Sequence, residues 1–128
     1  MKMLEHDAFH LRSLGDLRAQ IARLALDIPV ADDVSALTRP LSFAGKALPN
    51  RFCALPLEGG DANPNGSPGR LTMRRYTRYA QGGFVLIWLE AVAVREEARS
   101  GPHQLWIHPR NAETFAELVR EIRKTAKN

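Results

Sequence analysis

The chain has 128 residues, enough for one small domain with a hydrophobic core of its own. Hydrophobic residues make up 45% and charged residues 25%, proportions that are ordinary for a soluble globular protein. The longest apolar run, residues 84–89, is far too short to span a bilayer, and Glu5 and Asp7 stand where a signal peptide is apolar. We therefore expect a cytoplasmic protein that has no membrane segment.

The net charge of +4 and the pI near 9.7 raise the question of nucleic-acid binding. The basic residues are scattered along helical stretches and alternate with apolar positions, which is typical of solvated helix faces. We expect no nucleic-acid partner. The single cysteine, Cys53, lies in an apolar run, which predicts a buried, unreactive thiol.

The N-terminal part begins with a predicted helix, residues 14–26, which Ser13 caps. A linker with turn signals, residues 27–39, follows it. Two short segments, residues 41–43 and 46–48, then flank Ala44-Gly45, and this pattern predicts a hairpin with a tight turn.

The next stretch reads as strand, loop and helix. Residues 51–57 are apolar almost without alternation, which predicts a strand buried on both faces. Residues 58–71 form a long loop rich in glycine and proline, of the length that is usually functional or disordered. Thr72 is the expected cap of a helix that runs to about Gln81 and ends at Gly82-Gly83.

A second strand and helix complete the pattern. Residues 84–94 predict another buried strand, interrupted near its end by Glu90, and residues 95–109 form a loop. The last helix runs from Ala112 to about Ala126 and is capped by Asn111. The alternation of buried strands and helices predicts a parallel α/β fold.

Several segments in this order resemble the NADH:flavin oxidoreductases of the old yellow enzyme family. They are the stretch Leu41-Ser42-Phe43-Ala44-Gly45-Lys46-Ala47-Leu48-Pro49-Asn50-Arg51, then Ala54-Leu55-Pro56-Leu57-Glu58-Gly59, Leu71-Thr72 with Arg74-Arg75-Tyr76, Leu86-Ile87-Trp88 through Glu90-Ala91-Val92-Ala93-Val94, and Gln104-Leu105-Trp106. No single motif is decisive, and the resemblance rests on their joint order and spacing over about residues 41–126.

The resemblance implies an eight-stranded (β/α)8 TIM barrel, a fold that typically needs about 250 residues. This chain supplies only a part of it. We expect residues 1–40 to be a helical extension with a linker, and residues 41–128 to be the hairpin and the first two βα units of the barrel domain.

The resemblance also implies a binding site for FMN at the carboxyl ends of the strands. The matching positions are Pro56, Leu57 and Glu58 after the first strand and Ala91 after the second. Relatives often carry Thr or Cys where this chain has Glu58, so the role of that carboxylate is open. Each position also has a plainer interpretation: Pro56 ends a strand, Glu58 is a solvated loop residue, and Ala91 is small because barrel interiors are crowded.

Most of the family's other functional parts have no counterpart here. The strand-three Gln, the His-x-Gly-Arg segment, the substrate-binding His/Asn or His/His pair and the proton-donating Tyr are not identifiable, so no catalytic residue is assigned, and no metal site is expected. We expect an FMN-dependent NAD(P)H oxidoreductase of the ene-reductase type that is inactive as this chain alone. The full barrel would use NAD(P)H and an electron-poor alkene or similar acceptor.

Two partner arrangements and one other class of function stay open. A partial barrel exposes strand edges and apolar faces, which predicts self-association or a second chain that completes the barrel. The alternative is a non-catalytic βαβα interaction module or a gene remnant.

Overall fold

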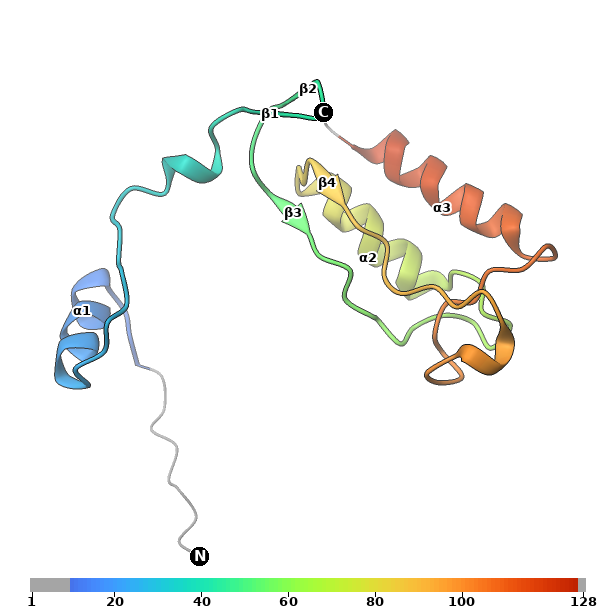
Figure 1. Cartoon of the computed structure of the whole chain (residues 1–128), viewed down its shortest axis with the longest axis horizontal. Coiled ribbons are helices and arrows are strands. Elements are labelled where there is room, and N and C mark those ends of the chain that lie inside the picture. Colours follow the sequence, from blue (N-terminus) through green and yellow to red (C-terminus); the bar gives the residue numbers. More distant parts are fainter. Residues whose placement is uncertain (1–9, 127–128) are drawn as a thin grey trace, which may run out of the picture. The chain divides into compact units, whose positions relative to one another are not determined.

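The computed structural model describes residues 10–126, and these fall into two compact units that divide between Val34 and Ser35. The first unit holds helix α1, Leu14–Arg23 (Figure 1). Ser13 caps it as predicted, because its Oγ accepts a hydrogen bond from the Asp16 amide at 3.1 Å. The helix ends before the predicted Leu26, since Ala25 takes a left-handed conformation with φ of 49°.

The second unit opens with a 3-10 turn at Ser35–Leu37 and then the predicted hairpin. Strands β1, Leu41–Phe43, and β2, Lys46–Leu48, pair antiparallel with Phe43 opposite Lys46. The two turn residues, Ala44 and Gly45, have φ values of 48° and 74°. Positive φ at both central residues is the geometry that matches the twist of a two-residue hairpin, so the hairpin is confirmed.

Two short parallel strands form the centre of this unit. Strand β3, Cys53–Ala54, pairs with β4, Leu86–Ile87, and the Trp88 amide continues the ladder by donating to the Ala54 carbonyl at 3.0 Å. The parallel arrangement confirms the α/β prediction. The regular strands are much shorter than the predicted 51–57 and 84–94, because β3 and β4 pair only with each other within the described residues.

Helix α2, Arg70–Gln81, begins two residues before the predicted cap. Gly69 is the N-cap, and Thr72 lies inside the first turn, where its Oγ accepts from the Gly69 amide at 3.2 Å and donates to Asp61 Oδ1 at 2.7 Å. Thr72 is therefore a buried link to the preceding loop rather than the cap. The predicted glycine stop is confirmed, since Gly83 has φ of 81°.

A 3-10 turn at Glu96–Ala98 lies in the following loop, and helix α3, Ala112–Thr125, closes the unit. Asn111 occupies the cap position, but its side chain does not bind the helix. It accepts from the His108 amide at 2.9 Å and donates to the Trp106 carbonyl at 2.8 Å. The loop before α3 competes for this amide group, and that competition explains why the predicted capping contact is absent.

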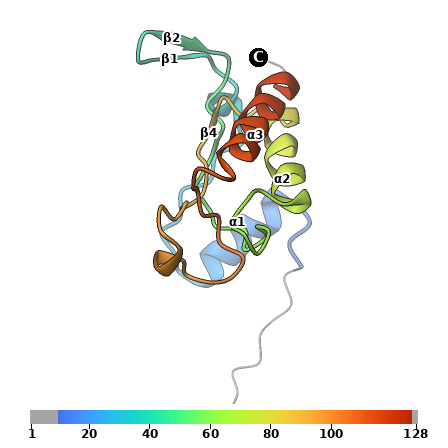
Figure 2. The ribbon, with the colours of Figure 1, turned by 90° about the vertical axis from the view of Figure 1, so that its right-hand side faces the viewer.

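The core lies where α2 and α3 pack side by side (Figures 1 and 2). Tyr76 and Leu118 are fully buried there, and Leu105, Phe115 and Ala62 form a cluster against the loops. Burying these side chains supplies the main favourable term in folding. Within the described residues, no helix is long and apolar enough to cross a membrane.

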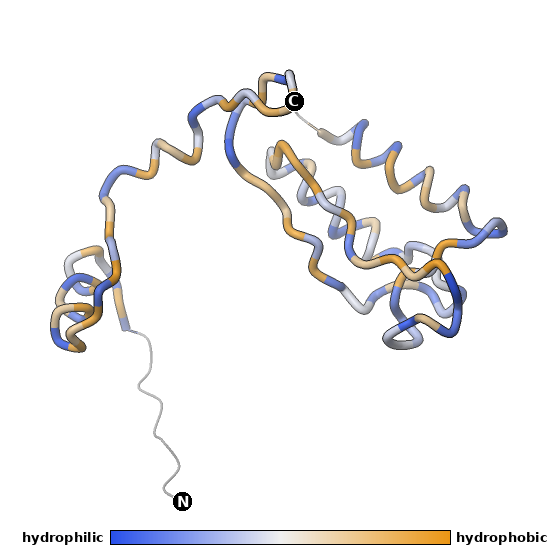
Figure 3. The backbone as a smooth tube through the Cα atoms, viewed as in Figure 1, coloured by the Kyte–Doolittle hydropathy of each residue, from blue (hydrophilic) through white to orange (hydrophobic). Residues whose placement is uncertain are grey.

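The prediction that both strands are buried on both faces is wrong for this chain. Ala54 is buried, but the next side chain of each strand points to the other face, and there Leu55 is 73% exposed and Trp88 is 55% exposed. The apolar stretches of β3 and β4 are orange in Figure 3. Within residues 35–126, helix α2 packs against β4, and Cys53 at the start of β3 is half-buried rather than buried.

Candidate functional site

The carboxyl ends of β3 and β4 bring together two of the predicted cofactor positions. Glu58 follows β3 and Ala91 follows β4, and a single side chain links them. Gln104 Nε2 donates to Glu58 Oε1 at 3.1 Å and to the Ala91 carbonyl at 3.3 Å. Parallel strands place their carboxyl ends at one edge, so this contact follows from the register of the pair.

Glu58 is held in place from two directions. Ser100 Oγ donates to its second oxygen, Oε2, at 3.2 Å, and the Ser100 amide donates to Gln104 Oε1 at 2.6 Å. Gln104 itself is buried, so its amide orientation is fixed by these contacts. Glu58 is thus an exposed loop residue, as in the plainer interpretation, but its carboxylate is bound to the loop that contains Ser100 and Gln104.

The other two predicted positions, Pro56 and Leu57, are open to solvent. The Leu57 side chain is 76% exposed, and its amide donates to the Leu55 carbonyl at 2.9 Å, so the chain turns sharply after β3. These residues present an apolar side chain and a turned backbone at the strand edge. Ala91, which is also exposed, adds no bulk beyond its β-carbon.

Below this edge lies a buried ionic network centred on Glu90. Its side chain is 1% exposed, and Oε1 accepts from Arg75 Nη2 at 2.6 Å and from the Tyr76 hydroxyl at 3.2 Å. The Glu90 amide donates to the same Tyr76 oxygen at 2.8 Å. Oε2 accepts from the Gly59 amide at 2.8 Å. A buried carboxylate needs such partners, because an unpaired charge in the interior is costly.

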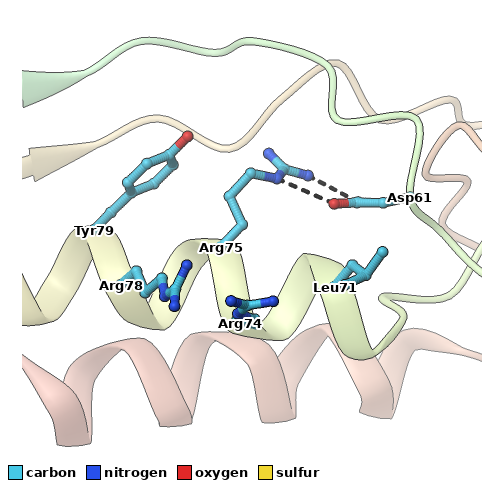
Figure 4. A pocket seen from close by; sticks show the side chains of 6 residues that line it. All are labelled: Asp61, Leu71, Arg74, Arg75, Arg78 and Tyr79. Carbon is cyan, nitrogen blue, oxygen red and sulfur yellow. Dashed lines mark hydrogen bonds and ion pairs between the residues drawn. The ribbon is translucent and has the colours of Figure 1, made fainter.

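Arg75 extends the network to Asp61. Its Nη2 and Nε donate to the two carboxylate oxygens of Asp61 at 2.9 and 3.2 Å, the forked geometry that suits a guanidinium (Figure 4). Burial alone would lower the pKa of Arg75, but its bonds to Asp61 and Glu90 raise it. Arg75 therefore stays charged.

The pKa values of the two groups beside Arg75 shift in opposite directions. Burial alone would raise the pKa of Asp61, but hydrogen bonds from Arg75 and Thr72 outweigh it and hold the pKa below its usual value. Burial raises the pKa of Tyr76, and the charge of Glu90 adds to the rise. Tyr76 is therefore a neutral hydroxyl at physiological pH.

The sequence pattern does not reveal this network. From the pattern, Glu90 only interrupts a strand, and Arg75 is one of the basic residues expected on solvated helix faces. One signal was available: a lone carboxylate in a strongly apolar run must find a cation or hydrogen-bond donors if the strand is buried. The sequence offered many arginines as partners and no way to choose among them.

An open pocket of about 420 Å³ lies beside α2, away from the predicted positions. Its lining residues are Asp61, Leu71, Arg74, Arg75, Arg78 and Tyr79 (Figure 4). Arg75 points toward Asp61, whereas Arg74 and Arg78 form no ion pair within residues 10–126. Because this pocket contains none of the strand-end residues, we regard the strand-end edge as the candidate site.

No family model and no curated protein matches the chain. Solved structures do match it. Morphinone reductase in complex with tetrahydroNAD is 27% identical, with a TM-score of 0.60 over 70% of this chain and 24% of that one. An old yellow enzyme homologue from Zymomonas mobilis is 25% identical, with a TM-score of 0.58 over 70% and 25% of the two chains. The old yellow enzyme from Pichia sp. AKU4542, at 21% identity and a TM-score of 0.61, supports the fold alone.

The chain thus spans about a quarter of the length of the structures it matches. It is a mixed α/β structure, and residues 10–126 contain no closed barrel. Its structural neighbours are members of the old yellow enzyme family, and they confirm the resemblance that the sequence carries.

Proposed function

We propose that this chain is part of an FMN-dependent NAD(P)H oxidoreductase of the ene-reductase type. It would supply the hairpin and the first two βα units of a (β/α)8 barrel. The observation that carries this proposal is the likeness to reductases at 25–27% identity over 70% of the chain but only a quarter of theirs. One of those reductases was solved with tetrahydroNAD, which supports a nicotinamide as the electron donor.

The strand-end residues fit a flat aromatic cofactor. The exposed Leu57 side chain offers an apolar surface, and Ala91 leaves room beside it. Backbone groups of Pro56, Leu57 and Glu58 would face the ring, and Gln104 would keep Glu58 and Ala91 at a fixed separation. FMN, when bound, supplies the hydride chemistry, and this chain supplies one edge of its binding surface.

In this proposal the chain alone binds FMN weakly and does not turn over. Its described residues provide no substrate-binding His pair, and the one buried Tyr, Tyr76, is tied to Glu90 on the helix side. A complete active site would need the remaining βα units. They would come from further polypeptide, either by self-association or from a second chain that completes the barrel.

The test is FMN binding by the purified chain. Quenching of FMN fluorescence on titration, abolished by Ala91→Trp at the strand edge, would support the proposal. Arg78→Ala, on the outside of α2, is the matched control and should leave quenching unchanged. A folded chain that leaves FMN fluorescence unchanged at millimolar protein would exclude the flavin site.

A non-catalytic interaction module is the second candidate, and the exposed strand face favours it. Leu55, Leu57 and Trp88 are all more than half exposed and lie on or just beyond adjacent strands. An apolar surface of this kind commonly marks a protein interface. A colourless, folded oligomer of fixed stoichiometry in sedimentation would favour this function, and a stable monomer would count against both candidates.

A further inference from the structure

One carboxylate, Glu90, connects the loop after β3 with helix α2. Its Oε2 accepts from the Gly59 amide at 2.8 Å, whereas Oε1 accepts from Arg75 Nη2 and the Tyr76 hydroxyl. Each carboxylate oxygen has its own hydrogen-bond donors, so Glu90 binds the loop and the helix at the same time. Because the Glu90 side chain is only 1% exposed, water cannot replace either set of hydrogen-bond donors.

Gly59 lies directly against the guanidinium of Arg75. A β-carbon at position 59 would be 2.1 Å from Arg75 Nη2 and 2.5 Å from its central carbon. Arg75 cannot easily move aside, because Asp61 and Glu90 hold it with three bonds of 2.6–3.2 Å. A side chain at position 59 would have to displace the guanidinium from these partners, so the loop backbone and the network are packed directly against each other.

A second contact reaches the same loop two residues earlier. Arg75 Nη1 donates to the Leu57 carbonyl at 3.4 Å. Arg75 thus fixes Leu57 at the start of segment 57–59, and Glu90 fixes Gly59 at its end. The Leu57 and Glu58 side chains stay exposed. These two residues are the ones that the proposed function places against the cofactor.

We infer that Glu90 is a positioning residue: paired with Arg75, it sets the conformation of segment 57–59 at the strand edge. Its importance for cofactor binding rests on the proposed function, but its action on the loop does not. The charge of Glu90 is what makes the arrangement work, because both oxygens must be acceptors at once.

The substitution Glu90→Gln removes one of the two acceptor oxygens while keeping the size and shape of the side chain. Its amide has one acceptor oxygen in place of two. If that oxygen stays on Arg75 and Tyr76, the amide NH₂ group faces the Gly59 N–H, and two donors oppose each other. The reverse orientation would place the NH₂ group against the guanidinium, which is worse. E90Q should therefore release the Gly59 amide.

The direct measurement is hydrogen exchange of single amides by NMR on the full chain. We expect the Gly59 amide of E90Q to exchange at least about tenfold faster than in the wild type, with the Leu118 amide in α3 as a reference for global opening. Glu113→Gln is the matched control, since Glu113 is exposed and its ion pair among residues 10–126 is with Arg120. Unchanged Gly59 exchange, or an equal acceleration at Leu118, would overturn the inference.

The substitution Gly59→Ala tests the same contact from the exposed loop. We expect its new methyl group to displace the guanidinium and shift the Arg75 Nε–H resonance, which reports on the bond to Asp61. An unshifted resonance would show that the loop does not bear on the network, and the inference would be wrong.

The FMN titration then separates the two proposals. If the wild type binds FMN and E90Q binds about tenfold more weakly, the loop conformation matters to the site. Equal binding by both, with faster Gly59 exchange in E90Q, would overturn the positioning role at the cofactor site. If the wild type binds no FMN, the proposed function fails, and the exchange result decides the inference alone.

Discussion

Removal of the Arg75 guanidinium should strongly destabilise the fold, because it is the cation of the buried network. In Arg75→Met, the aliphatic part of the side chain is kept and the guanidinium is lost. Glu90 then stays in the interior without its cation, and Asp61 loses both of its bonds to Arg75. Breaking a buried ion pair by removing one partner costs about 3–5 kcal/mol of unfolding free energy.

That magnitude is large against the total stability of a small domain, roughly 5–15 kcal/mol. Arg74→Met is the matched control, because Arg74 is the neighbouring residue of the same helix, is exposed, and has no ion pair within the described residues. It should change the unfolding free energy by no more than about 0.5 kcal/mol. Urea unfolding followed by far-UV circular dichroism at pH 7 gives both values.

Removing Glu90 as well should recover part of the lost stability. In the double variant Arg75→Met with Glu90→Leu, the unpaired charge of the more deeply buried carboxylate is gone, so this variant should be more stable than Arg75→Met alone. If R75M and R74M differ by less than about 1 kcal/mol, Glu90 is not buried with an essential cation, and the network is not a stabilising feature. A double variant that is no more stable than R75M would contradict the charge explanation.

Three further outcomes follow from buried contacts. Leu118→Ala should lower the unfolding free energy by about 2–5 kcal/mol in urea, since Leu118 is fully buried between the helices; a loss below about 1 kcal/mol would refute that packing. The pKa of Asp61 is lowered in the folded state, so its contribution is present above its unfolded pKa of about 3.9 and disappears as the pH falls through the folded value. The stability difference between wild type and Asp61→Asn should thus be constant from about pH 5 upward and shrink below about pH 4; a flat difference down to about pH 2 would contradict the shift. Gly66→Ala should destabilise the loop, because a β-carbon there would lie 2.6 Å from Trp106 Cβ and φ is 76°, and Gly101→Ala, which meets nothing within 4 Å, is its control in thermal unfolding.

The sequence by itself determined the local elements and the family resemblance. Ala44-Gly45 specified the hairpin turn, Ser13 specified the start of α1, and Gly82-Gly83 specified the end of α2. Such signals work because each depends on the backbone preferences of a few adjacent residues. The predicted positions Pro56, Leu57, Glu58 and Ala91 came from the order of motifs, and their contact with a cofactor stays a prediction.

Contacts between distant residues were decided only by the tertiary structure. Gly59 and Glu90 are 31 positions apart, and they meet because β3 and β4 pair in one particular register. The choice of Arg75 from several arginines on α2 depends on which face of that helix turns toward the strands. The burial of the strands was predicted wrongly for a related reason. An apolar run indicates that a strand can be covered on both faces, but only the surrounding chain decides whether anything covers it.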